Sequence, residues 1–190
     1  MNSTDGQDKK GFTVIEVALV LAIAGLIFMM VFLALPALNR TQRDSQRRDD
    51  MSLFLRNVKD YQTNNRGSLP AFSGSESEVT WNLARSASDD DLTWKGFYKK
   101  YLGENFVDPD GEPYTLAIMK CEATTSGGEC SNSVASIVNG LQNQSFPNGH
   151  KLHIVLQATC SGEKAVGTTN PRKLAALYRL EGAGVYCANT

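Results

Sequence analysis

The sequence predicts an α+β fold in which one long N-terminal helix packs on an antiparallel sheet of about three to five strands. Residues 12–38 are an apolar run whose only charged residue is Glu16. Residues 39–65 contain no glycine or proline and place apolar residues at helical spacing. The rest of the chain alternates between turn-rich stretches and short apolar segments, which is typical of strands joined by turns.

The apolar run is long enough to cross a membrane. It has 27 residues. As a helix it spans about 40 Å, whereas a bilayer core is about 30 Å thick. A secretory signal peptide with a cut near Ala34 or Ala37 is the alternative, but the apolar region of such a signal usually has only about 7–15 residues. The length therefore favours an uncleaved single-pass anchor.

The helix should continue past the membrane segment in amphipathic form. Its apolar stripe, which should lie on a sheet, repeats at helical spacing. Gly67 fits a C-cap and Pro70 a stop, so we predict one helix from Phe12 to about Asn65. The stripe consists of Met51, Phe54, Leu55, Val58 and Tyr61.

Charged residues on the two sides of the run give conflicting signals on topology. Lys9 and Lys10 precede it and favour a cytoplasmic N-terminus, whereas four arginines follow it within residues 40–48. The four cysteines all lie beyond the run and lack the C-x-x-C spacing of zinc or redox sites. They fit two disulfides in an exported domain, which agrees with Lys9 and Lys10.

We expect two short helices and four strands after the long helix. The helices lie near 81–86 and 91–102, the second capped by Asp89 or Asp90 and closed by Gly103. Residues 173–180 fit a helix or a strand, and their neighbours favour a strand, while residues 132–149 stay ambiguous. The predicted strands cover 114–120, 151–159, 173–180 and 185–187.

One short motif points to a function. Residues 10–16 read K-G-F-T-V-I-E: a basic residue, a glycine, a phenylalanine and a glutamate inside the apolar run. This resembles the cleavage and methylation signature of type IV prepilins, the class III signal. The resemblance covers the motif and the long helix. It implies that a prepilin peptidase recognises Lys10 and Gly11, cuts between Gly11 and Phe12, and methylates the new amine of Phe12.

The resemblance also divides the chain into functional segments. Residues 1–11 would be a cleaved leader, and residues 12–38 the transmembrane and assembly half of the helix. Residues 39–66 would be its amphipathic half, and residues 67–190 a globular pilin head with an antiparallel sheet.

Inserting a charged side chain such as Glu16 in a membrane helix costs about 2.5–3.5 kcal/mol of free energy, so its presence suggests a function. A buried charge needs a partner, and residues 12–38 offer no side-chain cation. In pilins the glutamate is taken to pair with the N-terminal amine of a neighbouring subunit, here that of Phe12, and so to set filament register. The alternative is a first-turn glutamate favoured by the helix dipole.

Two helix-disfavouring residues interrupt the apolar segment. In the family, a glycine and a proline bracket a stretch that melts or extends in the filament. Gly25 matches the glycine, whereas Pro36 lies about one turn later than in the best-known pilins. A tolerated membrane-helix kink is the alternative. The Arg/Asp-rich stretch 40–50 fits ion pairs between subunits or a solvated face equally well.

The cysteines should pair as neighbours along the chain. We expect Cys121–Cys130 and Cys160–Cys187, because each pair brackets a turn or a pair of strands. The second pair resembles the disulfide-bounded C-terminal region of many pilins.

A turn at residues 107–114, V-D-P-D-G-E-P-Y, resembles the D-P-x-G-x-x-Y turn of major pseudopilins. Pseudopilins bind Ca²⁺ in nearby loops, which makes Asp108 and Asp110 weak calcium candidates. Calcium takes about six to eight oxygens, however, and a proline turn explains the motif alone. We therefore expect no metal site and no cofactor.

The sequence does not favour an enzyme. His150 and His153 are the only histidines, and in a strand they would point to opposite faces. No G-x-S-x-G, P-loop or zinc-protease motif is present. Aromatic and basic residues interleave over 97–101, but an amphipathic helix explains them better than DNA contact, and the net charge is −1.

The favoured function is therefore structural, namely a subunit of a bacterial type IV pilus, with a major pilin preferred. The fibre would serve motility, adhesion or DNA uptake. Partners would be further copies in a helical filament, the prepilin peptidase, the assembly platform with minor pilins, and membrane lipid. The protein would start in the cytoplasmic membrane with its N-terminus inside and end in a surface pilus. The alternatives are a pseudopilin of a secretion or competence system and a membrane-anchored binding domain or enzyme.

Overall fold

The structure, a computed structural model, describes residues 11–72, 78–121, 127–130, 150–181 and 184–190. It divides into two compact units, Met1–Arg40 and Thr41–Thr190, and each is described by itself. Helix α1 (Val14–Asn64) contributes its first part to one unit and its second part to the other. The prediction of one helix from Phe12 to about Asn65 is therefore confirmed. The ambiguous stretch 132–149 lies outside the described residues.

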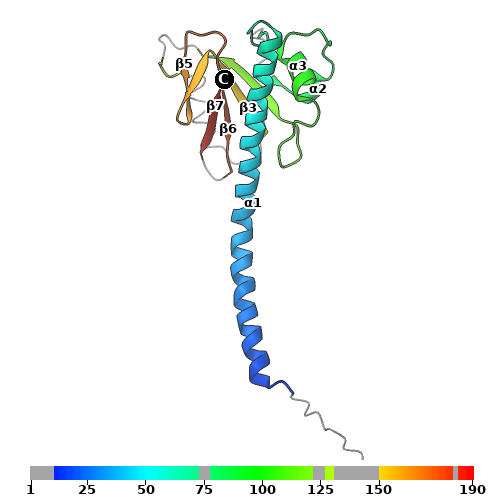
Figure 1. The fold of residues 1–190 in the computed structure, drawn as a ribbon, viewed down its shortest axis with the longest axis vertical. Coiled ribbons are helices and arrows are strands. Elements are labelled where there is room, and N and C mark those ends of the chain that lie inside the picture. Colours follow the sequence, from blue (N-terminus) through cyan, green and yellow to red (C-terminus); the bar gives the residue numbers. More distant parts are fainter. Residues whose placement is uncertain (1–10, 73–77, 122–126, 131–149, 182–183) are drawn as a thin grey trace, which may run out of the picture. The chain divides into compact units, whose positions relative to one another are not determined.

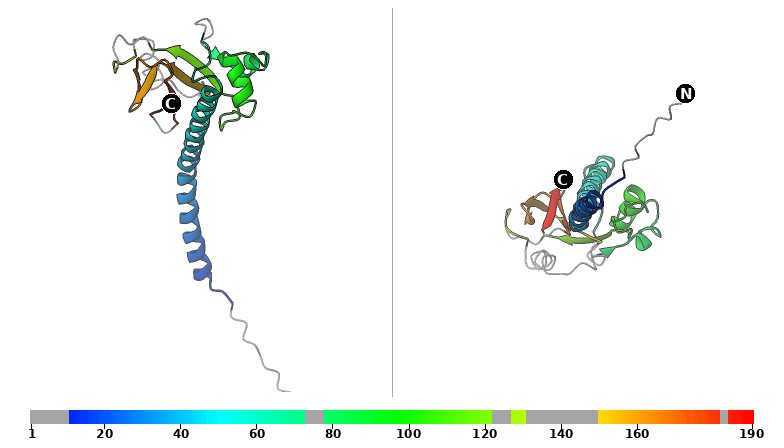
Figure 2. Two further views of the ribbon diagram at one scale, coloured as in Figure 1. Left: turned by 45° about the horizontal axis from the view of Figure 1, so that its top comes forward. Right: turned by 90° about the horizontal axis from the view of Figure 1, so that it is seen from below.

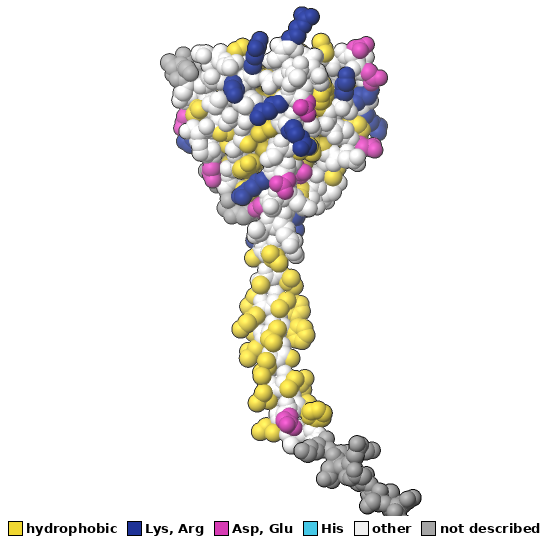
Figure 3. Space-filling view, viewed as in Figure 1, with side chains coloured by type: hydrophobic (Ala, Val, Ile, Leu, Met, Phe, Trp, Pro, Cys, Tyr) yellow, Lys and Arg dark blue, Asp and Glu magenta, His cyan; other side chains and the backbone are white. Residues whose placement is uncertain are grey.

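The first unit contains the apolar part of α1. Every large apolar side chain from Phe12 to Leu38 is exposed, with Phe12 at 89% and Leu35 lowest at 44%. Figure 3 shows this apolar cover and one acidic patch near its N-terminal end. Among the described helices, α1 alone is long and apolar enough to cross a membrane. It runs without a break through Gly25 and Pro36.

The second unit, which we call the head, is built around a sheet (Figure 1). Its five strands have the order β1-β2-β3-β6-β7, and β4 and β5 form a separate pair. The predicted strands over 114–120, 173–180 and 185–187 are confirmed as β2, β6 and β7. The bounds are β1 (Glu78–Val79), β2 (Thr115–Lys120), β3 (Lys151–Leu156), β4 (Ala158–Ser161), β5 (Lys164–Gly167), β6 (Leu174–Arg179) and β7 (Val185–Asn189).

The sheet is mixed rather than wholly antiparallel. β1–β2, β3–β6 and β6–β7 are antiparallel as predicted, but β2 and β3 pair in parallel. Parallel neighbours need a crossover of about a dozen residues or more, and the stretch between Lys120 and Lys151 is long enough to supply it. The expected wholly antiparallel sheet is therefore wrong for the β2–β3 pair, and strands β1 and β5 were not predicted.

The predicted strand over 151–159 is divided in two. Gln157 separates β3 from β4 and has φ 56°, in the left-handed region that a non-glycine residue seldom adopts. Its backbone N–H donates to the Lys173 carbonyl at 2.9 Å, and its carbonyl accepts from Thr168 N at 2.9 Å. These two bonds hold the break at the point where the chain turns away from β3 into the hairpin with β5.

The sheet has an apolar layer on each face, because alternate residues of its strands point to opposite sides. On one face, Leu116, Ile154 and Ala176 belong to the larger core, which includes the whole predicted stripe of α1, Met51 to Tyr61. Figure 2 shows the head part of α1 crossing this face. On the other face, Val155 and Leu177 pack with residues of the β4–β5 hairpin.

Two short helical pieces complete the large core. α2 (Trp81–Ala84) lies within the predicted helix over 81–86. The predicted helix over 91–102 is shorter at its start: α3 (Trp94–Phe97) continues into a π-helical turn, η1 (Tyr98–Leu102). Gly103 ends it as predicted, with φ 73°.

The N-cap predicted at Asp89 or Asp90 is wrong. Thr93 caps α3, since its hydroxyl accepts from Lys95 N at 3.3 Å, and Asp91 in turn accepts from Thr93 N at 2.7 Å. Asp89 instead forms an ion pair with Lys99 at 2.8 Å. A threonine nearer to the helix therefore takes the role assigned to the aspartates.

Candidate functional site

The K-G-F motif at residues 10–12 is exposed where the structure describes it. Gly11 is exposed and precedes α1, and Phe12 is 89% exposed. Lys10 lies outside the described residues. The Gly11–Phe12 junction is therefore exposed and lies just before the helix.

Glu16 and Thr13 form a capping box at the start of α1. The Glu16 carboxylate accepts hydrogen bonds from the Thr13 backbone N–H and hydroxyl, both at 2.9 Å. In return, Glu16 N donates to the Thr13 hydroxyl at 3.4 Å. This reciprocal arrangement satisfies donors that a helix start otherwise leaves free.

The capping box gives Glu16 a partner, Thr13, that was not predicted from the sequence. The spacing T-x-x-E indicates a capping box, and it is present in the sequence at Thr13 and Glu16. Among the described residues, the hydrogen-bond partner of Glu16 is the neutral Thr13.

A second constellation lies in the head, where Arg47 of α1 is surrounded by carboxylates. Its Nε and Nη2 donate to Asp108 Oδ1 and Oδ2 at 2.8 and 2.9 Å. Nη2 also donates to Asp110 at 3.0 Å, and Nη1 to Glu181 at 2.5 Å. Asp44 is 3.4 Å from Nη1. We call Asp44, Arg47, Asp108, Asp110 and Glu181 the Arg47 cluster.

Burial makes the centre of the Arg47 cluster matter for stability. The side chains of Arg47 and Asp108 are both 0% exposed. Burial alone would lower the pKa of Arg47, but the hydrogen bonds to Asp108 and Glu181 raise it above its ordinary value. Burial would likewise raise the pKa of Asp108, yet the bonds from Arg47 and Tyr178 lower it overall. Both groups are therefore charged at neutral pH.

Further hydrogen bonds link the Arg47 cluster to neighbouring side chains and join its members to one another. Tyr178 of β6 donates its hydroxyl to Asp108 at 2.8 Å, and Arg43 binds Glu181 through two bonds at 2.6 and 2.7 Å. Glu181 N donates to Asp44 at 2.8 Å. Three segments far apart in sequence thus meet: α1, the turn at 108–110, and Glu181, two residues after the end of β6.

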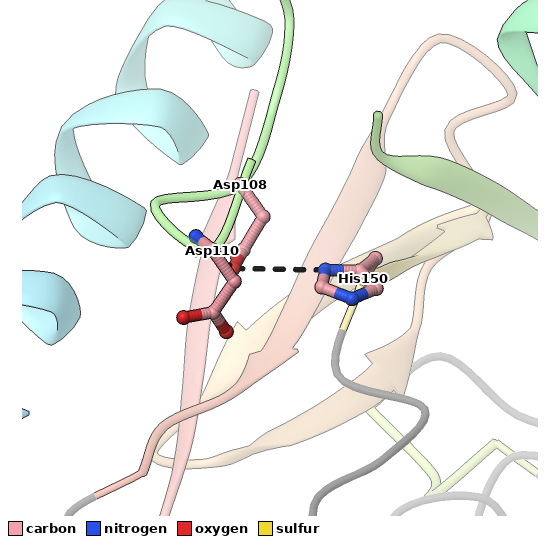
Figure 4. Close-up of side chains that lie close together, drawn as sticks. All are labelled: Asp108, Asp110 and His150. Atoms are coloured by element: carbon pink, nitrogen blue, oxygen red, sulfur yellow. Dashed lines mark hydrogen bonds and ion pairs between the residues drawn. The ribbon is translucent and has the colours of Figure 1, made fainter. Parts of the chain in front are cut away.

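Asp108 and Asp110, the two calcium candidates, both accept hydrogen bonds from Arg47. Asp108, Asp110 and His150 bring ligand atoms within 4.8 Å of one another, and Figure 4 shows the histidine ring facing Asp108. His150 Nδ1 is 3.6 Å from Asp108 Oδ2. However, Arg47 already binds both carboxylates, so a divalent ion would compete with a buried positive charge. The geometry fits an ion-pair anchor rather than a calcium site.

The importance of Arg47 and Asp44 was not predicted, although helix geometry contained a signal. Extending the apolar stripe back from Met51 by one and two turns reaches Arg47 and Asp44. Both are buried, at 1% and 8% exposure. Charged residues on the buried face of an amphipathic helix call for buried partners, but the sequence does not say which carboxylates these are.

The structure also places the disulfides, His153 and Phe97, which the sequence analysis singled out. Both expected disulfides are present: Cys121–Cys130 and Cys160–Cys187. His153 on β3 is 8% exposed and, in the described residues, is absent from the metal-capable group that contains His150. Phe97 is buried in the core, which agrees with the amphipathic-helix interpretation of residues 97–101.

Comparisons with known proteins add no relative. No family model matches the chain, and no curated protein or solved structure gives a significant match. Any functional conclusion therefore depends on the motif at residues 10–16, on α1 and on the head.

Proposed function

We propose that this chain is a structural subunit of a type IV pilus-like filament. It is made as a membrane precursor, cut between Gly11 and Phe12, and assembled through α1. The observation that supports this most is the division of α1. Its first part exposes apolar side chains on all sides, and its second part lies in the core of the head. Soluble monomers rarely leave such a large apolar surface uncovered.

The apolar surface of residues 12–38 would be covered first by lipid and later by other copies of the chain. Before assembly, residues 12–38 match the length of a bilayer crossing. In a filament, packed helices replace the lipid, and Glu16 is then enclosed among apolar side chains. The Phe12 amine of a neighbouring copy is a cation of suitable position, because Phe12 and Glu16 are about one helical turn apart.

The head supports an extracytoplasmic location. Two disulfides persist in oxidising compartments and are rare in the cytosol. The precursor would sit in the cytoplasmic membrane with its N-terminus inside, and the assembled fibre would lie on the cell surface. A major pilin serving motility, adhesion or DNA uptake is the favoured role. The prepilin peptidase, the assembly platform and minor pilins are the partners that this role requires.

The test is the N-terminus of the mature protein. Mass spectrometry of membrane and surface fractions should find a chain that begins at Phe12 and carries one N-methyl group. A mature chain that still contains residues 1–11, or one that starts near Asn39, would contradict the proposal. Gly11→Leu should block cleavage and leave a membrane precursor, whereas Gly103→Ala in the head should leave cleavage unchanged.

A pseudopilin is the second candidate, and one observation favours it. The D-P-D-G turn is tied to α1 through Asp108 and Arg47, so the resemblance of this turn to that of major pseudopilins falls on residues that organise the head. Imaging separates the two candidates. A pilin should yield long surface fibres dominated by this chain, whereas pseudopilins rarely make long fibres.

A further inference from the structure

The turn before β2 contains an Asp–Gly bond, Asp110–Gly111, in contact with the Arg47 cluster. The only other Asp–Gly dipeptide of the chain is Asp5–Gly6. Such a bond is chemically reactive, because glycine has no Cβ to shield its nitrogen and leaves the backbone free to bend. The glycine nitrogen can then attack the side-chain carboxyl carbon of the preceding aspartate. Asp110–Gly111 is therefore a candidate site of covalent modification.

The reaction of such a bond is an isomerisation that passes through a cyclic succinimide. A bond forms between Gly111 N and Asp110 Cγ, the nitrogen loses its proton, and one carboxyl oxygen leaves as water. Water then opens the ring at either carbonyl carbon. One opening restores aspartate, and the other gives isoaspartate, in which the main chain runs through the former side chain. No other reagent is consumed, because the second step takes up the water that the first step releases.

Both reacting groups of this bond are already bonded in the head. Gly111 N donates to the Asp108 carbonyl at 2.7 Å. Asp110 Oδ2 accepts from Arg47 Nη2 at 3.0 Å, and Asp110 Oδ1 lies 3.8 Å from Arg43 Nε. An oxygen held by a guanidinium cannot leave as water until that hydrogen bond breaks. The nitrogen, whose hydrogen is bonded to Asp108, has to break its bond as well before it can attack.

These contacts, and not burial, separate the two groups. The side chain of Asp110 is 42% exposed, so water reaches it. The backbone of the turn is fixed by Asp110 N, which donates to Asp108 Oδ2 at 3.1 Å, and by Asp108 N, which donates to the Glu112 carbonyl at 2.8 Å. Asp108 is in turn held by its two bonds to Arg47. The turn can therefore rearrange only when the Arg47–Asp108 pair opens.

We propose that Asp110–Gly111 is an isoaspartate-forming site that Arg47 keeps unreactive while the head is folded. Opening of the Arg47 cluster frees both reacting groups. Isoaspartate lengthens the main chain by one carbon and shortens the side chain by one, so the altered turn no longer presents the carboxylate that Arg47 binds. Opening of the turn thus becomes permanent. The proposal depends on contacts within the head and not on the proposed filament.

Isoaspartate can be measured directly in the full chain. The detergent-solubilised protein is incubated at neutral pH, either native or unfolded in urea. An isoaspartyl methyltransferase then labels isoaspartate, and peptide mapping locates the label. Mapping is needed because Asn139–Gly140 and Asn148–Gly149 also form isoaspartate. Residue 110 should isomerise at least about tenfold more slowly in the native chain than in urea, because the native turn has to open first. Equal rates in the two states would overturn the proposal.

Matched variants of the full chain show whether Arg47 is responsible. Arg47→Ala frees the Asp110 carboxylate and should raise the native rate by about tenfold or more, since the loss of one partner of a buried ion pair favours the opened turn. Leu174→Ala is the control, because Leu174 is fully buried in the large core and its loss destabilises the head without touching the Arg47 cluster. Its rate should stay within about twofold of the wild type. Equal increases in both variants would show that global folding alone protects the bond, and the proposal would be wrong.

Arg47→Lys decides the question if circular dichroism shows that Arg47→Ala does not fold. Lysine keeps the positive charge, but its single ammonium group lacks the planar fork with which Arg47 binds Asp108 and Asp110 together. Its rate at residue 110 should therefore lie above that of the wild type. A folded Arg47→Lys chain with the wild-type rate would overturn the proposal.

Discussion

The guanidinium of Arg47 and the carboxylate of Asp108 form a two-bond ion pair, at 2.8 and 2.9 Å, with both side chains fully buried. The two residues are 61 positions apart. One belongs to α1 and the other to the turn before β2, so the pair fixes the helix to the sheet at the end of the stripe nearest to the apolar segment. Paired Arg–carboxylate bonds are directional, which makes this contact suited to hold one orientation.

The first prediction concerns the independence of the head. Residues 40–190 should fold without the apolar segment, because they keep the stripe from Met51 to Tyr61, the Arg47 cluster and both disulfides. The fragment should be a soluble monomer by sedimentation, with a cooperative thermal transition. A fragment that still forms fibres would show that the assembly energy lies in the head.

The second prediction concerns Arg47. Arg47→Ala leaves Asp108 buried without its cation, which should cost about 3–5 kcal/mol of the free energy of unfolding. Arg56→Ala is the matched control, because Arg56 lies on the exposed side of the same helix, and it should cost less than about 0.5 kcal/mol. Urea titration of the fragment 40–190 measures both. Equal losses in the two variants would show that the Arg47 cluster adds no net stability.

The third prediction concerns pH. Burial, with a smaller contribution from nearby Lys151, lowers the pKa of His153 to about 4, whereas an unfolded histidine titrates near 6.5. The unfolded state therefore binds a proton first, so stability is complete above about pH 6.5 and falls as the pH drops towards 4. The loss is up to about 3 kcal/mol.

His153→Leu tests the origin of this pH dependence. It removes the titrating group from its buried position between Ala117 and Leu177 in the sheet and should flatten the stability of the fragment between pH 6.5 and 4.5. The pKa values of Asp108 and Glu181 are lowered, so these carboxylates affect stability only at lower pH. Their contribution to stability is lost as the pH falls below the pKa of an ordinary carboxyl group. A variant that keeps the wild-type slope in that window would show that His153 is not its cause.

Helical periodicity made the long helix and its stripe predictable, since Met51, Phe54 and Val58 repeat at fixed spacing within one segment. The Arg47 cluster was not predictable in the same way. Apart from Asp44, the carboxylates that bind Arg47 lie 61 to 134 positions away, and the charge pattern near Arg47 offers many possible pairs. The parallel pairing of β2 and β3 was also missed, because strand direction depends on the path of the connection rather than on the strands' own residues.

The last prediction separates two roles of Glu16. Glu16→Gln keeps an amide oxygen that can accept from Thr13 N, so the capping box survives while the charge is lost. Glu16→Ala removes both, and Thr13→Val removes the threonine hydroxyl and keeps the charge. Cleavage after Gly11 should continue in all three variants, because the scissile junction is unchanged.

Fibre yield should then follow the charge and not the capping box. In Glu16→Gln and Glu16→Ala the Phe12 amine of a neighbouring copy would be enclosed without its carboxylate, at a cost of about 3–5 kcal/mol for each contact, so fibres should be lost while cleaved subunits accumulate in the membrane. Glu16→Asp should be intermediate, because the shorter side chain keeps the charge and misses the distance. Thr13→Val should assemble nearly as the wild type does, since losing part of a cap costs only about 1 kcal/mol. If Glu16→Gln makes normal fibres and Glu16→Ala does not, the capping box explains Glu16, and filament register has to come from elsewhere on α1.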